Sequence, residues 1–161
     1  MNLKIKTYGE SILKEKCQEI KEIDKKIKDL AKEMLIVMSQ ENGVGLAAPQ
    51  IGKNKRMIVV SLDENIFTLI NPKITKKSKK ILSEYEGCLS LPNLSLKIKR
   101  AKEIELEGYL LERGKVVRIK AENLLARVFQ HEIDHLDGIL MIDRVSRFKK
   151  IRAIKKLKKF I

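Results

Sequence analysis

The stretch that decides the fold is "ENLLARVFQHEIDHLDG", Glu122 to Gly138. Its apolar residues recur every three or four positions, which is the period of an α-helix, and the final glycine is a typical helix stop. We therefore expect a helix over Glu122–Leu136. At about 100° per residue, one face of this helix carries Leu124, Val128, His131 and His135.

Glu132 falls within this apolar face, whereas Arg127 and Gln130 fall on the opposite face, which we expect to be exposed to solvent. A carboxylate buried without a partner is very unfavourable, so its position requires a chemical reason. The chain has only two histidines, His131 and His135, and they bracket this glutamate.

A metal site accounts for both observations. Histidines at positions i and i+4 of a helix can direct their ring nitrogens to one cation, and the glutamate between them can act on water bound there. Ordinary buried histidines would explain the spacing alone, but they would not explain the inward position of Glu132. A catalytic site of this kind needs a third protein ligand and one open coordination position.

The third ligand cannot be a histidine, so cysteine, aspartate and glutamate remain. Cys17 lies in the amphipathic stretch "KEKCQEI" and is interpreted as a packing residue. Cys88 lies in "YEGCLSLP", where Gly87 allows a tight turn of the backbone. We predict Cys88 as the ligand. A nucleophilic role for Cys88 with a histidine base is the alternative, but it leaves Glu132 without a function.

The rest of the chain predicts the elements that pack on this helix. "EIDKKIKDLAKEMLIVMSQENG" predicts an earlier helix with Asp24 as its N-cap and Asn42–Gly43 as its stop. Strands are expected at 56–62 and 67–74, with Pro72 ending the pairing of the second. Residues 94–121 alternate apolar and polar side chains around a turn at 112–115.

These elements predict the α+β class. We expect one domain, residues 1–161, in which a mainly antiparallel sheet packs around the central HExxH helix. An N-terminal helix and a basic C-terminal helix at 147–161 complete it. The C-terminal helix carries one apolar stripe, formed by Phe148, Ile151, Ile154, Leu157 and Ile161. This stripe either packs on the domain beneath a solvated lysine face or belongs to an amphipathic helix that lies on a membrane or RNA surface.

Composition narrows the class of protein. Hydrophobic residues make up 43% of the 161 residues, enough for a core. No apolar run approaches the roughly 20 residues of a membrane span, and the N-terminus lacks a secretory signal, so we expect a cytoplasmic protein without membrane insertion. The net charge of +14 indicates a polyanionic neighbour or simply a solvated lysine-rich surface. Aromatic residues are only 4%, which disfavours base stacking, and we expect no DNA partner.

A second unusual segment is "GVGLAAPQIG", Gly43 to Gly52, whose small residues allow a ligand or another backbone to approach closely. A tight helix-to-strand connection would explain it equally well. The segments "GVGLAAPQ", "EGCLS" and "HEIDH", in this order, resemble those of the peptide deformylases, and the similarity extends over the whole chain. That family removes the formyl group from the N-terminal methionine of new bacterial polypeptides.

The resemblance implies a role for each matching position. Cys88, His131 and His135 would bind one divalent metal ion, which would be Fe²⁺ in the cell, with Zn²⁺, Ni²⁺ or Co²⁺ possible in the purified protein. Glu132 would be the general base and acid. Gln50 and the backbone N–H of Leu89 would hydrogen-bond the developing oxyanion, and the backbone at Gly45 would hold the peptide. The methionine pocket would be lined by Val44, Leu124 and Val128.

The resemblance also implies partners, and it has limits. N-formylmethionyl nascent peptides would be substrates, and the helix at 147–161 would contact the ribosome, because basic amphipathic helices bind RNA surfaces. Many relatives have proline and arginine where this chain has Ser11 and Lys14. Arg100 is expected either to pair with Glu86 or to be an exposed charge. Two other classes remain open, an HExxH peptidase that cuts internal bonds and a structural metal site in an RNA-binding module.

Overall fold

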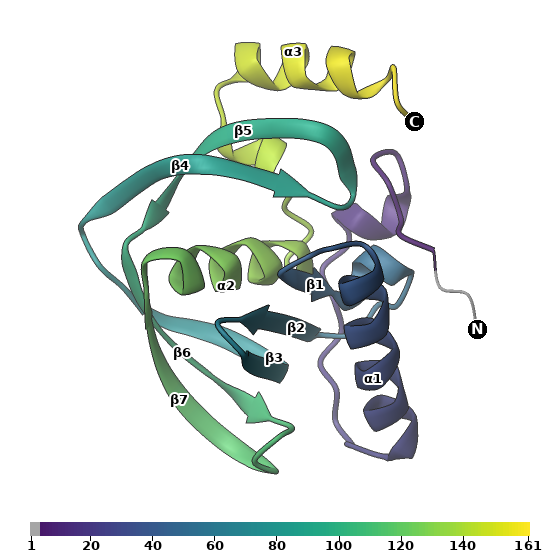
Figure 1. Ribbon diagram of the computed structural model, residues 1–161, viewed down its shortest axis with the longest axis vertical. Coiled ribbons are helices and arrows are strands. Elements are labelled where there is room, and N and C mark those ends of the chain that lie inside the picture. The colour runs from purple at the N-terminus through teal and green to yellow at the C-terminus, as the bar shows by residue number, and fades with distance from the viewer. Residues whose placement is uncertain (1–3) are drawn as a thin grey trace.

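The computed structural model describes residues 4–161 (Figure 1). Three α-helices form, α1 at Lys25–Gln40, α2 at Asn123–Leu136 and α3 at Arg147–Leu157. Short 3₁₀ helices are η1 at Ser11–Lys14, η2 at Ala48–Ile51 and η3 at Met141–Arg144. The strands are β1 at Gly45–Ala47, β2 at Met57–Leu62, β3 at Asn65–Lys77, β4 at Ile81–Cys88, β5 at Leu91–Ala101, β6 at Glu103–Leu110 and β7 at Lys115–Glu122.

The strands form two antiparallel sheets with α2 between them. The larger sheet has the order β1-β2-β3-β6-β7, and β4 and β5 form a separate hairpin. Figure 1 shows the hairpin passing over one side of α2 while the larger sheet covers the other side. The α+β prediction with a central HExxH helix is therefore confirmed.

The core between α2 and the larger sheet is apolar. Phe129 and Leu136 of α2 are fully buried, and they lie in one cluster with Ile58, Val60 and Leu106 from the strands. Burial of this many large side chains stabilises the helix far more than its own propensity does. The site residues on α2 are thus carried by a rigid element.

The prediction that one face of α2 is exposed is wrong. Arg127 and Gln130 are both buried, because the β4–β5 hairpin covers the face that carries them. The Arg127 guanidinium donates to the carbonyl oxygens of Leu82 and Ile98. Gln130 accepts from the N–H of Ala101 at 3.1 Å and donates to its carbonyl at 2.9 Å. These polar side chains therefore bond to hairpin backbone instead of water.

The helix α1 forms as the sequence predicts. The Asp24 side chain accepts from the N–H of Ile27 at 2.9 Å, which caps the helix, and Asn42 has a φ of 54° just beyond its end. The buried face carries Ile27, Ala31, Met34, Val37 and Met38. This face packs in a second apolar cluster with β1 and β2.

The strand predictions need two corrections. Pro72 does not end the pairing, because β3 continues to Lys77 with a register shift between Ile70 and Lys73. A bulge tolerates the missing N–H of proline, and the Pro72 carbonyl accepts from Arg56 at 3.2 Å. Residues 94–121 do not form one hairpin either, since the chain leaves β5 for the larger sheet at Lys102. The turn at Gly114 is confirmed, with a φ of 61°.

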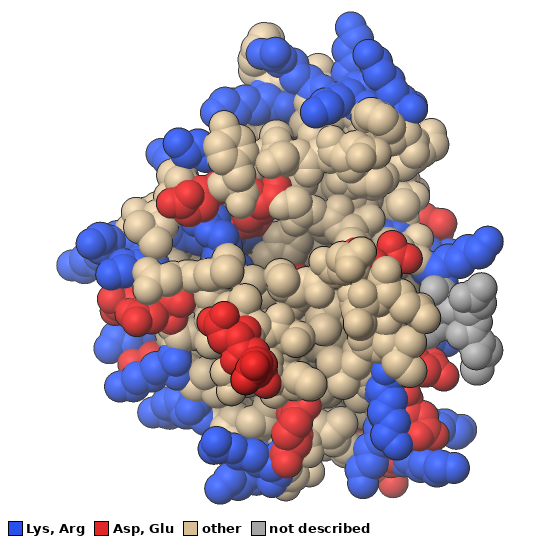
Figure 2. Space-filling model, in the orientation of Figure 1, with Lys and Arg blue, Asp and Glu red and all other residues tan. Residues whose placement is uncertain are grey.

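The C-terminal helix is only partly packed. Ala153 and Leu157 are buried against β5 and η3, but Phe148 is 69% exposed, so the apolar stripe packs on the domain only in part. Ile151 and Ile161 are exposed as well, and α3 ends at Leu157. Figure 2 shows Lys and Arg side chains gathered over α3. In the part of the chain that the structure describes, no helix is long and apolar enough to cross a membrane.

Candidate metal centre

Three soft or borderline ligand atoms meet where the hairpin touches α2. Cys88 is the last residue of β4, and His131 and His135 lie one turn apart on the facing side of α2. The ligand atoms of these three residues all lie within 4.8 Å of one another. The Cys88 Sγ lies 3.3 Å from Nε2 of His135. The structure thus brings together the predicted ligands from two distant segments.

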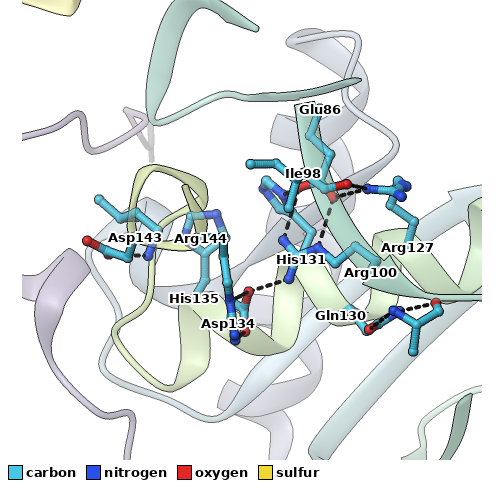
Figure 3. A network of polar contacts seen from close by, with 12 residues as sticks. Glu86, Ile98, Arg100, Arg127, Gln130, His131, Asp134, His135, Asp143 and Arg144 are labelled. Carbon is cyan, nitrogen blue, oxygen red and sulfur yellow. Dashed lines mark hydrogen bonds and ion pairs between the residues drawn. The ribbon is translucent and has the colours of Figure 1, made fainter. Parts of the chain in front are cut away.

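A buried carboxylate orients one of the imidazoles. Nδ1 of His131 lies 2.9 Å from Oε2 of Glu86, which leaves Nε2 of that ring for the metal side. Glu86 also accepts from Arg100 at 2.9 and 3.0 Å and from Arg127 at 2.7 Å (Figure 3). Burial alone would raise the pKa of Glu86, but the hydrogen bonds from His131 and Arg100 and the Arg100 charge outweigh burial and lower the pKa far below its usual range.

The two imidazoles have opposite electrostatic environments. Burial opposes the charged form of His131, but its hydrogen bonds to Cys88 and Glu86 outweigh burial and raise its pKa well above the usual range. Burial lowers the pKa of His135, and the neighbouring His131 lowers it further. Cys88 and Glu86 therefore favour a positive charge on or beside the His131 ring. A metal cation bound there would take the place of the proton that the His131 ring otherwise holds.

Glu132 lies beside these ligands with its carboxylate inside the protein. It is only 5% exposed, and burial raises its pKa to about 7. A carboxyl group with this pKa can accept and release a proton near neutral pH. Gly45 of β1 lies against it so closely that a Cβ at Gly45 would stand 2.5 Å from the Glu132 Oε1. The absence of a side chain at Gly45 thus leaves the space that the Glu132 carboxylate occupies.

The donor set fits a divalent metal ion. Within residues 4–161, the buried side-chain polar atoms without a hydrogen-bond partner are Glu132 Oε2 and His135 Nδ1, and both belong to this cluster. Buried polar groups are almost always paired, so the unpaired Glu132 oxygen marks a place for a bound ligand, whereas Nδ1 of His135 lies on the far side of the ring from the Nε2 that faces Cys88. One thiolate and two imidazoles suit zinc, iron, cobalt or nickel, and three protein ligands leave a position open.

The hairpin tip presents Cys88 directly after Gly87. Gly87 does not adopt a left-handed conformation, and the irregularity of the pairing falls at this residue. The pairing of β4 with β5 shifts its register between Glu86 and Cys88, and this irregularity turns the thiol toward α2. The buried Ser90 accepts from Nε2 of Gln50 at 3.2 Å, which ties the tip to η2.

A cavity of about 650 Å³ opens beside the cluster, between the hairpin, β1 and α2. It lies on the face that Figure 2 shows, where the hollow below the hairpin is largely uncharged. Apart from the buried His135, every predicted site residue lines it: Val44, Gly45, Gln50, Cys88, Leu89, Leu124, Val128, His131 and Glu132. Leu124 and Val44 are 54% and 47% exposed at its rim, whereas Val128 is buried within it.

Several residues of the site escaped the sequence analysis. The pair of Arg100 with Glu86 was one of two expectations and is confirmed by its two hydrogen bonds. Arg127, Asp134 and Ser90 were missed. Arg127 and Asp134 look like solvent-facing charges in any helical projection, and only the burial of that face by the hairpin shows otherwise.

Comparison with known proteins finds relatives that match most of the chain. A family model described as Polypeptide deformylase matches residues 2–151. The chain belongs to the polypeptide deformylase family. A peptide deformylase of Dictyoglomus turgidum is 47% identical over 144 residues, which cover 89% of this chain and 93% of that protein. One from Thermodesulfovibrio yellowstonii is 46% identical over 161 residues, 97% and 96% of the two chains.

Solved deformylase structures share the fold as well. The peptide deformylase of Ehrlichia chaffeensis in complex with actinonin superposes with a TM-score of 0.93 at 36% identity, covering 98% of this chain and 96% of that chain. The enzyme of Synechococcus elongatus, also with actinonin, gives 0.91 at 37% identity, covering 98% and 86%. The resemblance inferred from three short motifs is confirmed, and the chain is a peptide deformylase enzyme by these relationships.

Proposed function

We propose that this deformylase is a metal-dependent hydrolase that removes the formyl group from N-formylmethionyl nascent peptides and releases formate. The observation that carries the proposal is the cluster of Cys88, His131 and His135, with ligand atoms within 4.8 Å, beside the unpaired buried carboxylate of Glu132. A peptidase that cuts internal bonds or a structural metal site would not need this combination with a thiolate and an open position.

Cys88, His131 and His135 would hold the cation. When bound, a divalent cation acts as a Lewis acid that makes hydroxide available from water near neutral pH. We propose Fe²⁺ in the cell, with Zn²⁺, Ni²⁺ or Co²⁺ as alternatives in the purified protein, since the donor set suits all four.

Glu132 is the proposed general base and acid. Its raised pKa, about 7, lets the carboxylate take the proton of the attacking water. The proton stays on the Glu132 carboxyl while the tetrahedral species exists. Glu132 then gives it to the departing amine nitrogen, and the carboxylate is restored for the next turnover.

Two donors are proposed to stabilise the developing oxyanion. Oε1 of Gln50 accepts from the N–H of Ala47 at 2.8 Å, which fixes the amide so that its Nε2 faces Cys88 at 3.7 Å. The second donor is the backbone N–H of Leu89, the residue after Cys88. Removal of one such donor typically costs roughly 3 kcal/mol of transition-state stabilisation.

The cavity supports a formylmethionyl substrate. Val44, Leu124 and Val128 form an apolar side that would take the methionine side chain, and the backbone at Gly45 would hold the peptide. A formyl carbon carries only hydrogen, so a tight site admits it while excluding bulkier acyl groups. Acetyl-methionyl peptides should therefore be poor substrates, and equal turnover of acetyl and formyl peptides would contradict this assignment.

The central test measures formate released from formyl-Met-Ala-Ser. The parent protein should release formate, and Glu132→Gln, which keeps the shape but cannot accept the proton, should reduce kcat by a factor of about 10² to 10⁴. The Glu132→Gln variant should still bind one metal ion. If it keeps parental activity, the assigned base is wrong, and if the parent cuts only internal bonds, the peptidase alternative is right.

We also propose that α3 contacts the ribosome in the cytoplasm as part of a single catalytic domain, residues 1–161. Its exposed face carries Lys149, Arg152, Lys155 and Lys156, with no acidic residue between them. Deleting α3 would uncover the buried Leu157 contacts, so charge reversal is the cleaner test. Reversal of Lys149, Arg152 and Lys156 to Glu should weaken salt-dependent co-sedimentation with ribosomes.

The control for this experiment reverses three exposed lysines on α1, Lys25, Lys28 and Lys32. It changes the net charge by the same amount at a different place. Equal loss of co-sedimentation in both triple variants would mean that only the overall charge matters, and unchanged co-sedimentation of the α3 variant would exclude the proposed contact.

A further inference from the structure

A continuous line of ion pairs leads from η3 at the surface to the inner side of His131 (Figure 3). Arg144 donates through two nitrogens to the Asp134 carboxylate, with Nε 3.0 Å from Oδ2. Asp134 also accepts from Nη1 of Arg100. The other two guanidinium donors of Arg100 bond to Glu86, which in turn holds Nδ1 of His131.

The members of this line differ in burial. The side chains of Arg100 and Glu86 are 4% and 5% exposed, that of Asp134 is 11% exposed, and that of Arg144 is 38% exposed. The outer end therefore meets solvent, where a substitution is tolerated, whereas the inner end does not. The charges alternate along the line, so each carboxylate lies between two cations or between a cation and an imidazole.

Asp134 and Glu86 share one guanidinium. Arg100 directs one nitrogen to Asp134 and two to Glu86, and its pKa is raised because its hydrogen bonds to Glu86 and the Asp134 charge outweigh burial. If Arg144 is removed, only Arg100 compensates the Asp134 charge. The guanidinium is then drawn toward Asp134 and away from Glu86, because an uncompensated buried carboxylate is costly.

We propose that Arg144 and Asp134 are positioning residues that set how firmly His131 holds the metal ion. Their side chains act through Arg100 and Glu86, and the hydrogen bonds that these side chains make do not go to a metal ligand. This proposal rests on the proposed metal site, and it links η3, the segment directly before α3, to the retention of the cation. The sequence separation of 58 residues between Glu86 and Arg144 gives no hint of this connection.

The test measures metal release, which does not depend on turnover. The protein is loaded with Zn²⁺, mixed with an excess of a chromogenic chelator, and followed until release is complete. Loss of an outer-sphere partner typically weakens metal binding roughly 10-fold to 100-fold, and we expect Glu86→Gln to fall in that range. Arg144 lies two links further out, so Arg144→Gln should release zinc about 3-fold to 10-fold faster than the parent.

The matched control is Arg118→Gln. Arg118 also bonds a carboxylate, Glu107, through two nitrogens, but it lies on the exposed face of β6 and β7, away from the site. Its release rate should equal that of the parent. Arg144→Lys should be intermediate, because lysine keeps the charge but not the two-point contact. Equal rates for Arg144→Gln and the parent, or an equal increase in Arg118→Gln, would overturn the proposal.

A second measurement separates this proposal from the metal site itself. The proton on Nδ1 of His131 can be followed by NMR in ¹⁵N-histidine-labelled protein with and without Zn²⁺. Its exchange with water should be faster in Arg144→Gln, since Glu86 holds the ring less firmly. If the parent retains no metal, the proposed function fails while the exchange still reports on the line of ion pairs. Unchanged exchange in Arg144→Gln would overturn the positioning role.

Discussion

Replacing Gly45 by alanine should remove most of the activity and leave the fold in place. A Cβ at this position would stand 2.5 Å from Oε1 of Glu132 and 2.9 Å from its Cγ and Cδ. Ordinary contact begins at 3.4 Å, so the carboxylate would have to retreat by about 0.9 Å. The β1 backbone cannot move away easily, because Gly45 pairs with Val60 and β1 packs between α1 and α2.

A shift of this size would be costly for Glu132 in its proposed role as general base. Misplacing a catalytic group by about 1 Å can lower the rate roughly 100-fold, which corresponds to about 2.7 kcal/mol of activation free energy. The folded state should nevertheless survive the substitution. Gly45 has no left-handed backbone conformation, so alanine adds no backbone strain, and overpacking at one methyl group costs about 1–3 kcal/mol. The melting temperature should then fall by no more than about 10 °C.

The assay is kcat/KM for formate release, measured beside thermal unfolding and metal content. Gly87→Ala is the matched control, since Gly87 lines the same cavity but a Cβ there would meet only the Leu94 carbonyl oxygen at 3.9 Å. It should keep activity within about threefold of the parent, because one methyl group in free space changes little. The reasoning is refuted if Gly45→Ala keeps similar activity, or if both alanine variants lose activity equally.

Three further outcomes follow from packing, charge and the metal site. Dialysis against a strong chelator should abolish formate release and lower the melting temperature, and added divalent metal should restore both, because a ligand that binds only the folded state stabilises it. Retained activity in metal-free protein would contradict the proposed metal dependence. Leu157→Ala should cost about 2–5 kcal/mol in urea unfolding, since that side chain is fully buried, whereas the 69% exposed Phe148 should tolerate alanine within about 0.5 kcal/mol. Burial raises the pKa of Cys17 from 9.0 to about 11, so the stability contributed by its neutral thiol is fully present below pH 9 and is lost as the pH rises through 11. Relative to Cys17→Ala, the parent should lose unfolding free energy over this interval, and parallel pH profiles would show that Cys17 does not titrate there.

The helices at the centre of the fold and the histidine pair could be predicted from the sequence, because the patterns that indicate them are local. Helical period, the Asp24 cap and the bracketing of Glu132 by two histidines depend only on residues close in the chain. The choice of Cys88 as the third ligand followed by elimination, and the structure brings its sulfur to 3.3 Å from His135. The local pattern thus predicts the helix α2. Cys88 is predicted as the third ligand because the chain has no third histidine and Cys17 lies in a stretch interpreted as packing.

The failures share a physical cause, which is contact between distant segments. Arg127 and Gln130 were assigned to solvent because nothing in the helical period reveals that a hairpin covers them. Strand β4 was not predicted, since its residues are mostly exposed and show no regular alternation. The sequence around Pro72 predicts a strand end, but the bulge beside it and the bond from Arg56 to its carbonyl accommodate the proline within β3.

The position of α2 between two sheets has a consequence for biosynthesis. The sulfur donor comes from the β4–β5 hairpin and the imidazole donors from α2, and they meet only when the hairpin has docked on the helix. A chain interrupted before residue 135 would carry the thiol but lack a complete donor set. Catalytic competence would therefore report that synthesis has passed His135 and that the layers are assembled, which makes activity a stricter measure of correct folding than solubility or helix content.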